Sequence, residues 1–185
     1  YGIRISMDKD PWSNKNLRAA IAYAIDRKTL IDAYYGGAGR PAYIPEGAGW
    51  AFNPDIKVYD YDPQKAKDKL TEAGYPKGIT FDYWCGATAD ENVSPQLCEM
   101  VQAMLSRVGI NTNIVLVPIA DYFQKQVRRE SHFSHTFFSP RADPHGRLFR
   151  VFHSKGASNI SGYNNPEVDK LLEDAARVYD IAKAK

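Results

Sequence analysis

The chain has 185 residues, of which 44% are hydrophobic and 25% are charged, an ordinary composition for a globular domain with its own core. The formal net charge is only +2, and no basic run is longer than a pair such as Arg128-Arg129, which argues against nucleic-acid binding. No apolar stretch approaches the roughly 20 residues that a membrane-spanning helix needs. The chain begins at Tyr1 rather than at methionine, so we expect a processed product or a fragment.

The first third of the chain is predicted to form a strand, a helical segment and a long loop. The strand is expected over Tyr1–Ser6. Residues 14–35 carry apolar side chains at the helical period, and Asp26 is placed to break and recap the helix before Gly36. Residues 36–61 are rich in glycine, proline and aromatic residues and have no helical period. A loop this long usually has a function or covers a surface.

Three later helices share one start signal, an oxygen-bearing cap residue followed by proline. The signals are Asp62-Pro63, Ser94-Pro95 and Asn165-Pro166, and the helices are expected to end at Gly74, at Gly109 and near Tyr179. Each segment aligns apolar residues on one side. We therefore predict that each helix buries one face against the rest of the domain.

Strands are predicted between these helices, over Ile79–Cys85, Ile110–Val117 and Phe133–Ser139. Strands that alternate with helices are joined by crossover connections, which place the strands in a largely parallel or mixed sheet. The sequence thus indicates an α/β fold over residues 1–185, with helices packed on the sheet.

The two cysteines, Cys85 and Cys98, are thirteen positions apart. In an exported protein they could form one disulfide, worth roughly 3 kcal/mol through the entropy of the unfolded chain. Two separate buried thiols are the alternative. The sequence leaves both open.

Sequence motifs for catalysis and phosphate binding are missing. There is no G-x-S-x-G elbow, and no cysteine lies in a protease-like context. The stretch "GGAG" at 36–39 lacks the lysine of a phosphate-binding loop and follows a predicted helix, so it is expected to form a turn. An enzyme is the less favoured interpretation.

A metal site is also disfavoured. His132 and His135 are three positions apart on a predicted strand, which points their side chains to opposite faces. His145 and His153 follow, with Asp143 between the pairs, but there is no H-E-x-x-H motif and no cysteine pair at metal-ligand spacing. We expect hydrogen-bonded or solvent-exposed histidines, with no bound metal and no cofactor.

Recognition of a polar ligand remains. The strand that begins at Phe133 leads into "PRADPHGR", where prolines stiffen a loop that carries Arg141 and Asp143. Ligands of α/β proteins bind beyond the carboxyl ends of strands. Arg141 offers a bidentate fork for a carboxylate or phosphate, and Asp143 can accept bonds from an ammonium or hydroxyl group. In the alternative interpretation both residues only satisfy their own loop.

Aromatic residues provide further candidates. Trp84 and Gly86 end the strand "YWCG" in the same topological position, where the indole can stack on a ligand and the glycine lets a ligand approach the backbone. Trp84 can equally be a core residue. Trp50 lies in the long loop and must contact either a ligand or the domain's own apolar face.

Several stretches together resemble the solute-binding proteins of peptide-type ABC importers, the extracellular family 5 group. The matching text is "LRAAIAYAIDRKTLIDAYYGGAGRPA", "YDPQKAKDKLTEAGYPKGITFDY", "LSRVGINTNIVLV", "PRADPHGRLFRVFHSKG" and "NISGYNNPEVDKLLEDA", in order from about residue 15 to residue 177. The resemblance implies a periplasmic-binding-protein type II fold. It also implies a two-lobed receptor, periplasmic or extracellular and in some cases lipid-anchored, which closes around a small polar solute without catalysis and passes it to a membrane permease.

Members of that family are more than twice this length, so the chain would be most of the second lobe, without the N-terminal lobe. The family's peptide-binding members carry a loop of the form W-x-x-D-x-x-D-P, which holds the peptide amino terminus. Here Pro140 stands at the first aspartate, Asp143 at the second, and Phe137 or Phe138 in place of the tryptophan. With Ser139 and Arg141 in the loop, the resemblance points instead to a solute with an anionic group, such as an opine, a sugar phosphate or a modified peptide.

A ligand-sensing signalling module of the same fold is the second hypothesis, and a metal-dependent enzyme the third.

Overall fold

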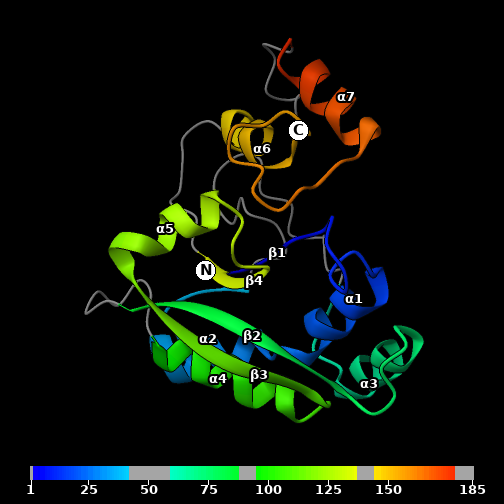
Figure 1. Cartoon of the computed structure of the whole chain (residues 1–185), viewed down its shortest axis with the longest axis vertical. Coiled ribbons are helices and arrows are strands. Elements are labelled where there is room, and N and C mark those ends of the chain that lie inside the picture. Colours follow the sequence, from blue (N-terminus) through cyan, green and yellow to red (C-terminus); the bar gives the residue numbers. More distant parts are fainter. Residues whose placement is uncertain (1, 42–58, 88–94, 137–143, 178–185) are drawn as a thin grey trace.

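The computed structural model describes residues 2–41, 59–87, 95–136 and 144–177 (Figure 1). Four strands and seven helices lie within these residues. In chain order they are β1 (Gly2–Ile5), α1 (Lys15–Ala24), α2 (Arg27–Tyr35), α3 (Pro63–Glu72), β2 (Ile79–Ala87), α4 (Pro95–Ser106), β3 (Ile110–Pro118), α5 (Ile119–Val127), β4 (Phe133–Thr136), α6 (Pro144–Phe152) and α7 (Pro166–Ala175).

The strands form one mixed sheet in the order β1-β4-β2-β3. β2 runs parallel to both β3 and β4, whereas β1 runs antiparallel to β4. Helices α4 and α5 make the two crossovers between the parallel strands; the α4 crossover was predicted, and α5 was not. Figure 1 shows α1, α2 and α4 on one side of the sheet and α5 on the other.

Side-chain caps begin most of the predicted helices. Asn14 accepts hydrogen bonds from the first backbone N–H groups of α1, and Asp62 and Asn165 do the same at α3 and α7. Asp26 separates α1 from α2 and caps α2 through the Thr29 N–H, as expected. At the end of α2, Gly36 adopts the left-handed conformation, with φ 57°.

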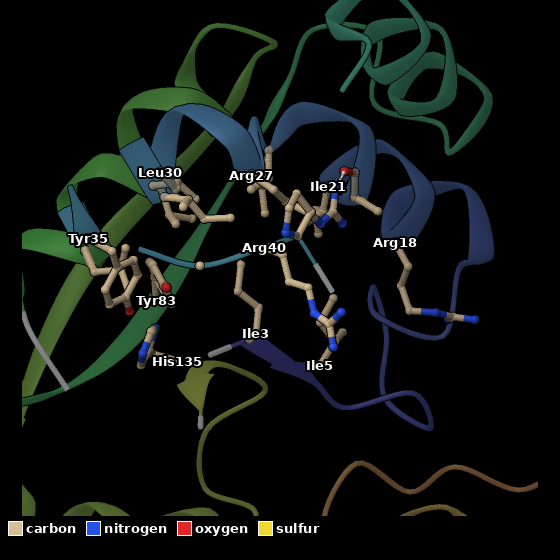
Figure 2. A pocket seen from close by; sticks show the side chains of 18 of the residues that line it. Ile3, Ile5, Arg18, Ile21, Arg27, Leu30, Tyr35, Arg40, Tyr83 and His135 are labelled. Carbon is tan, nitrogen blue, oxygen red and sulfur yellow. Dashed lines mark hydrogen bonds between the residues drawn. The ribbon is translucent and has the colours of Figure 1, made fainter. Parts of the chain in front are cut away.

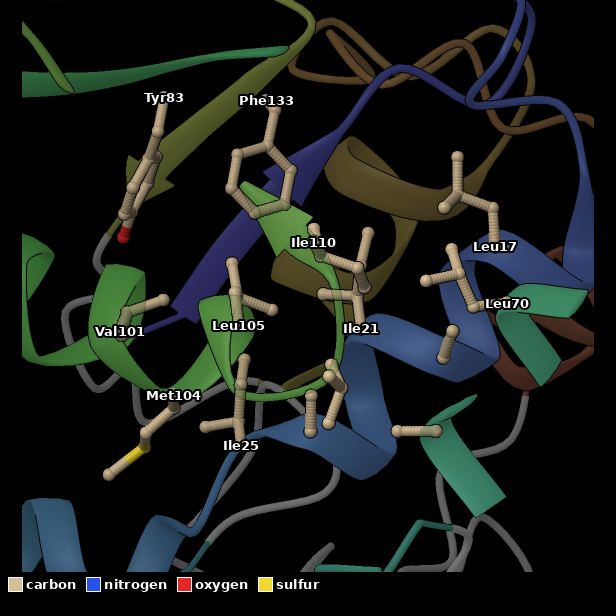
Figure 3. Close-up of a cluster of buried hydrophobic side chains, with 14 of the residues drawn as sticks. Leu17, Ile21, Ile25, Leu70, Tyr83, Val101, Met104, Leu105, Ile110 and Phe133 are labelled. Carbon is tan, nitrogen blue, oxygen red and sulfur yellow. The ribbon is translucent and has the colours of Figure 1, made fainter. Parts of the chain in front are cut away.

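The core lies between the sheet and helices α1, α3 and α4 (Figure 3). Trp12, Phe81 and Phe133 form an aromatic cluster, with ring centroids 4.3 Å apart for Trp12–Phe81 and 5.4 Å for Trp12–Phe133. The apolar residues predicted to share one face of each helix are buried here: Leu17, Ala20, Ile21 and Ala24 of α1, Ala66 and Leu70 of α3, and Leu97, Val101 and Leu105 of α4. Helical periodicity therefore located the core correctly.

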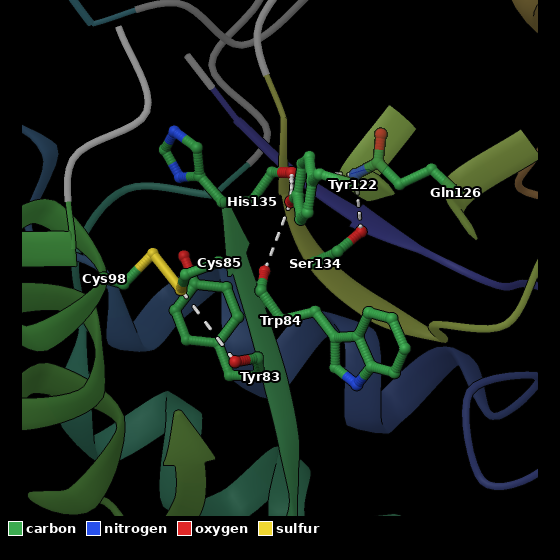
Figure 4. The surroundings of a disulfide bond; sticks show 8 residues. All are labelled: Tyr83, Trp84, Cys85, Cys98, Tyr122, Gln126, Ser134 and His135. Carbon is green, nitrogen blue, oxygen red and sulfur yellow. Dashed lines mark hydrogen bonds between the residues drawn. A yellow bond between two sulfur atoms is a disulfide. The ribbon is translucent and has the colours of Figure 1, made fainter. Parts of the chain in front are cut away.

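A disulfide joins Cys85 of β2 to Cys98 of α4 (Figure 4). Both cysteines are fully buried. Of the two alternatives left open by the sequence, the cross-linked one is confirmed.

Three features of the C-terminal half differ from the prediction. Helix α5 has no side-chain cap at its start, so the start signal used for the other helices is missing. Helix α6 begins at Pro144, within the stretch where we expected a loop. In the sequence, Asp143-Pro144 repeats the acid-proline pattern of Asp62-Pro63, which precedes α3. Helix α7 contacts mainly α6, and none of its residues is buried; Leu171 is 67% exposed. The buried face predicted for α7 was therefore wrong.

Candidate functional site

The carboxyl ends of β2 and β4 lie side by side at one edge of the sheet. The two strands are parallel neighbours, with Trp84 opposite Ser134, and they end at Ala87 and Thr136. The two strands therefore end at adjacent points, just before residues 88–94 and 137–143. This edge is where α/β folds hold their ligands.

Most of the predicted ligand residues belong to segments that the structure does not describe. Arg141, Asp143, Phe138 and Ser139 lie in residues 137–143, and Trp50 lies in residues 42–58, outside the described residues. Their roles stay predictions. Residues 36–41 and 59–61 of the predicted loop are described and contain neither strand nor helix beyond the turn after α2.

Trp84 is half-buried on the face of the sheet opposite the main core. Its neighbours Tyr83 and Cys85 are buried on the core side, whereas the indole points the other way (Figure 4). The ammonium group of Lys125 in α5 lies 5.6 Å from the centroid of the Trp84 ring, a cation–π contact. Trp84 is thus not a residue of the main core, and its predicted stacking on a ligand stays a prediction. Gly86 is buried and stands opposite Val117 of β3.

A buried polar network fixes α5 to the strand ends (Figure 4). The Tyr122 hydroxyl donates to the carbonyl oxygen of His135 or of Trp84, at 3.2 Å from the latter. The Gln126 side-chain amide donates to the Ser134 hydroxyl at 3.1 Å and to the His135 carbonyl at 3.0 Å. Burial raises the pKa of Tyr122 above its usual range, so its hydroxyl stays a donor. The network thereby holds the ends of β2 and β4 together.

This network was not predicted from the sequence. Tyr122 and Gln126 are four positions apart, a spacing that places both side chains on one face of a helix. Had α5 been predicted, this spacing would have indicated that the two side chains act together. Their partners are mostly backbone carbonyls on other strands, and no local pattern announces such partners.

The histidines occupy separate places. His132 contacts the Ser6 hydroxyl at 3.2 Å, and His135 faces the core side of the sheet. In the helical pair α6 and α7, the Nε2 atom of His145 lies 2.8 Å from the Leu172 carbonyl, and that of His153 lies 3.2 Å from a Glu173 carboxylate oxygen. Among the described residues, no group of three His, Cys, Asp or Glu side chains is placed to hold a metal ion.

None of the helices in the described part of the chain is both long enough and apolar enough to span a membrane.

The family model of the bacterial extracellular solute-binding proteins, family 5, middle region, matches residues 1–159. The chain belongs to this family. Heme-binding protein A of Haemophilus influenzae is 35% identical over 181 residues, which cover 94% of this chain and 33% of that protein. The dipeptide-binding protein of Escherichia coli K12 is 34% identical over 187 residues, covering 96% of this chain and 35% of the relative.

The fold agrees with solved structures of the same group. The ABC transporter-associated periplasmic binding protein DppA from Helicobacter pylori, in complex with the peptide STSA, superimposes with a TM-score of 0.90 at 27% identity, over 98% of this chain and 36% of that one. The α/β lobe therefore has the periplasmic-binding-protein type II fold that the family resemblance implied. The chain spans about a third of the length of these relatives.

Proposed function

We propose that residues 1–185 form most of one lobe, the second, of an extracytoplasmic solute-binding protein that serves an ABC importer. The complete protein would capture a small polar solute, of the peptide, opine or sugar-phosphate class, between this lobe and an N-terminal lobe, and deliver it to the membrane permease. The observation that carries the proposal is that β2, which holds Trp84 and Gly86, and β4, which precedes Arg141 and Asp143 in the sequence, end side by side in a family 5 chain.

The proposed mechanism makes and breaks no bond. A solute that contacts both lobes stabilises the closed arrangement by its difference in affinity between the closed and open forms. The network of Tyr122, Gln126 and Ser134 supports this role, because it holds the two strand ends in one geometry before the solute arrives. This pre-organisation lowers the entropy lost on binding.

Within the site, we assign the anion-binding role to Arg141 and the acceptor role to Asp143. Ser139 and Phe138 precede them in the same segment. An arginine fork pairs with a carboxylate or phosphate in a bidentate manner, which suits an opine or a sugar phosphate better than a free peptide amine.

A periplasmic or extracellular location is part of the proposal. The buried disulfide between Cys85 and Cys98 supports it, because disulfides persist in oxidising compartments. A relative in Salmonella typhimurium, the peptide transport periplasmic protein SapA, is 29% identical and points the same way.

The test uses the full-length parent receptor. Mass spectrometry of the solute that co-purifies with it identifies the ligand class, and titration calorimetry then compares wild type with Arg141→Ala. We expect the variant to lose about fivefold or more in affinity, since a bond to a charged group is worth more than about 1 kcal/mol. Arg128→Ala, which removes an arginine with a 70% exposed side chain on the far end of α5, is the matched control and should bind as wild type. An Arg141→Ala affinity within twofold of wild type would contradict the anion-binding role.

A further inference from the structure

A cavity of about 450 Å³ lies on the core side of the sheet, between β1, β2 and β4 and the helices α1, α2 and α4 (Figure 2). Its walls are mainly aliphatic, with Ile3, Ile21, Leu30, Ile31, Leu97 and Val101 among them. Neither Trp84 nor Gly86 lines it, because Trp84 points to the opposite face of the sheet. In the described part of the chain, the cavity is thus separate from the two strand-end residues of the proposed solute site.

One end of the cavity is polar. Figure 2 shows Tyr35, Tyr83 and His135 gathered there, from α2, β2 and β4. Tyr83 is fully buried, and its hydroxyl has no hydrogen-bond partner among the described residues. An unsatisfied buried hydroxyl costs on the order of 1–3 kcal/mol, and such groups are rare in folded proteins. The Tyr83 hydroxyl is therefore a donor and acceptor in need of a partner.

The polar end is uncharged at neutral pH. Burial raises the pKa of Tyr83 above its usual range and lowers the pKa of His135 to about 4, with the charge of the N-terminus as a smaller contribution. Three cationic side chains also line the cavity, those of Arg18, Arg27 and Arg40. Arg18 donates to the backbone carbonyls of Trp12 and Ser13, and Arg27 donates to those of Ala22 and Tyr59. Arg40 is exposed, and Figure 2 shows it apart from the polar end formed by Tyr35, Tyr83 and His135. The walls therefore suit an apolar body, and the polar end suits a neutral hydrogen-bonding group.

We propose that this cavity is a second binding site, for an apolar and uncharged small molecule whose single hydroxyl or amide group hydrogen-bonds to the Tyr83 hydroxyl. Its volume lies within the roughly 300–1,000 Å³ of known small-molecule pockets, and its lining of apolar walls with a few convergent polar groups is typical of them. The site is independent of the proposed import of a polar solute, which is assigned to the segments beyond β2 and β4.

The experiment titrates the 185-residue chain with three matched probes: 2-naphthol, naphthalene and naphthalene-2-sulfonate. Calorimetry measures affinity, and backbone amide shifts in NMR spectra locate the binding. We expect 2-naphthol to bind once per chain, with shifts at α2, β1 and β4. It should bind about fivefold more tightly than naphthalene, the value of one neutral hydrogen bond, and more tightly than the sulfonate.

Two variants and one control sharpen the test. Tyr83→Phe keeps the ring and removes the hydroxyl, so 2-naphthol and naphthalene should then bind equally well. Ala38→Trp adds bulk at an exposed position of the cavity wall and should abolish binding of both probes. Tyr61→Phe removes the hydroxyl of a tyrosine that is 42% exposed and outside the cavity lining, and should change nothing.

The proposal is overturned if 2-naphthol does not bind up to its solubility limit, if its shifts map elsewhere, or if Tyr83→Phe preserves the preference over naphthalene. Tighter binding of the sulfonate would show an anion site instead and would overturn it as well. None of these outcomes bears on the import function, which is tested by the solute recovered from the full-length receptor.

Discussion

Arg4 is a buried arginine held by neutral oxygens. It is 7% exposed, and no carboxylate pairs with it in the described part of the chain. Its guanidinium donates to the hydroxyl of Ser134 at 3.2 Å, to the carbonyl of Ile160 at 2.9 Å and to Ser131. Because these partners lie on β4, before β4 and after α6, one side chain joins β1 to two distant segments. A buried charge without such bonds would be costly.

His135 gives a prediction at the same scale. Its folded-state pKa of about 4 lies below the usual 6.5, chiefly because burial disfavours the charged ring. Between these two pH values His135 is protonated in the unfolded chain and neutral in the folded chain. The free energy of unfolding therefore falls as the pH falls through this window. We expect wild type to lose about 2 kcal/mol more than His135→Gln between pH 7 and pH 4.5.

Urea unfolding of both proteins at the two pH values measures this difference. His132, whose pKa is also lowered by burial, and the acidic residues are present in both proteins, so their contributions cancel. Parallel losses of stability in wild type and variant would contradict the prediction.

At the scale of the elements, the disulfide ties β2 to α4, the helix of the first crossover. Its sulfur atoms are buried beside the core, and the two cysteines are 13 positions apart. Closing a loop of this length removes entropy from the unfolded chain. We expect the double variant Cys85→Ala, Cys98→Ala to be less stable than wild type by about 2–4 kcal/mol.

Urea unfolding with and without a reducing agent provides the measurement and its control. Reduction should lower the stability of wild type and leave that of the double variant unchanged. If reduction destabilises neither protein, the cross-link contributes nothing to folding.

Helices with a side-chain cap were predictable, and so was the sheet. Asp62, Asn14 and Asn165 each precede an apolar repeat, and both the cap and the repeat are local features of the sequence. Helix α5 was missed because Pro118 precedes it without a side-chain cap. Helix α6 was missed because Pro144 was assigned to a loop stiffened by prolines. Whether the apolar side of α7 is buried depends on which other elements pack against it, and the local sequence does not carry this information.

The candidate site was predictable only in outline. The position of the two strand ends follows from the order of strands and helices, which the sequence reveals. The partners of Tyr122 and the solitary hydroxyl of Tyr83 depend on which backbone groups other strands bring within about 3 Å. Such contacts are set by tertiary packing, so sequence reasoning passed over both residues.

At the scale of the whole molecule, the lobe is expected to provide one side of a two-sided site. A solute that touches only one lobe makes fewer contacts and remains largely hydrated, so its affinity is low. We expect the 185-residue chain to give no heat of binding at micromolar concentrations of the polar solute recovered from the full-length receptor. The full-length receptor, titrated in the same buffer, is the control. Tight binding by the isolated chain would show that the second lobe is not needed for the site.

The bond between Cys85 and Cys98 also fixes which side chains of β2 point to each face of the sheet. Side chains of a strand alternate between its two faces, so moving β2 by a single position would exchange Tyr83 with Trp84. That shift would point the sulfur of Cys85 away from α4, and the oxidised chain cannot make it. Covalent chemistry thus excludes the misaligned sheet, in which the indole would fill the cavity and the phenol would face Lys125.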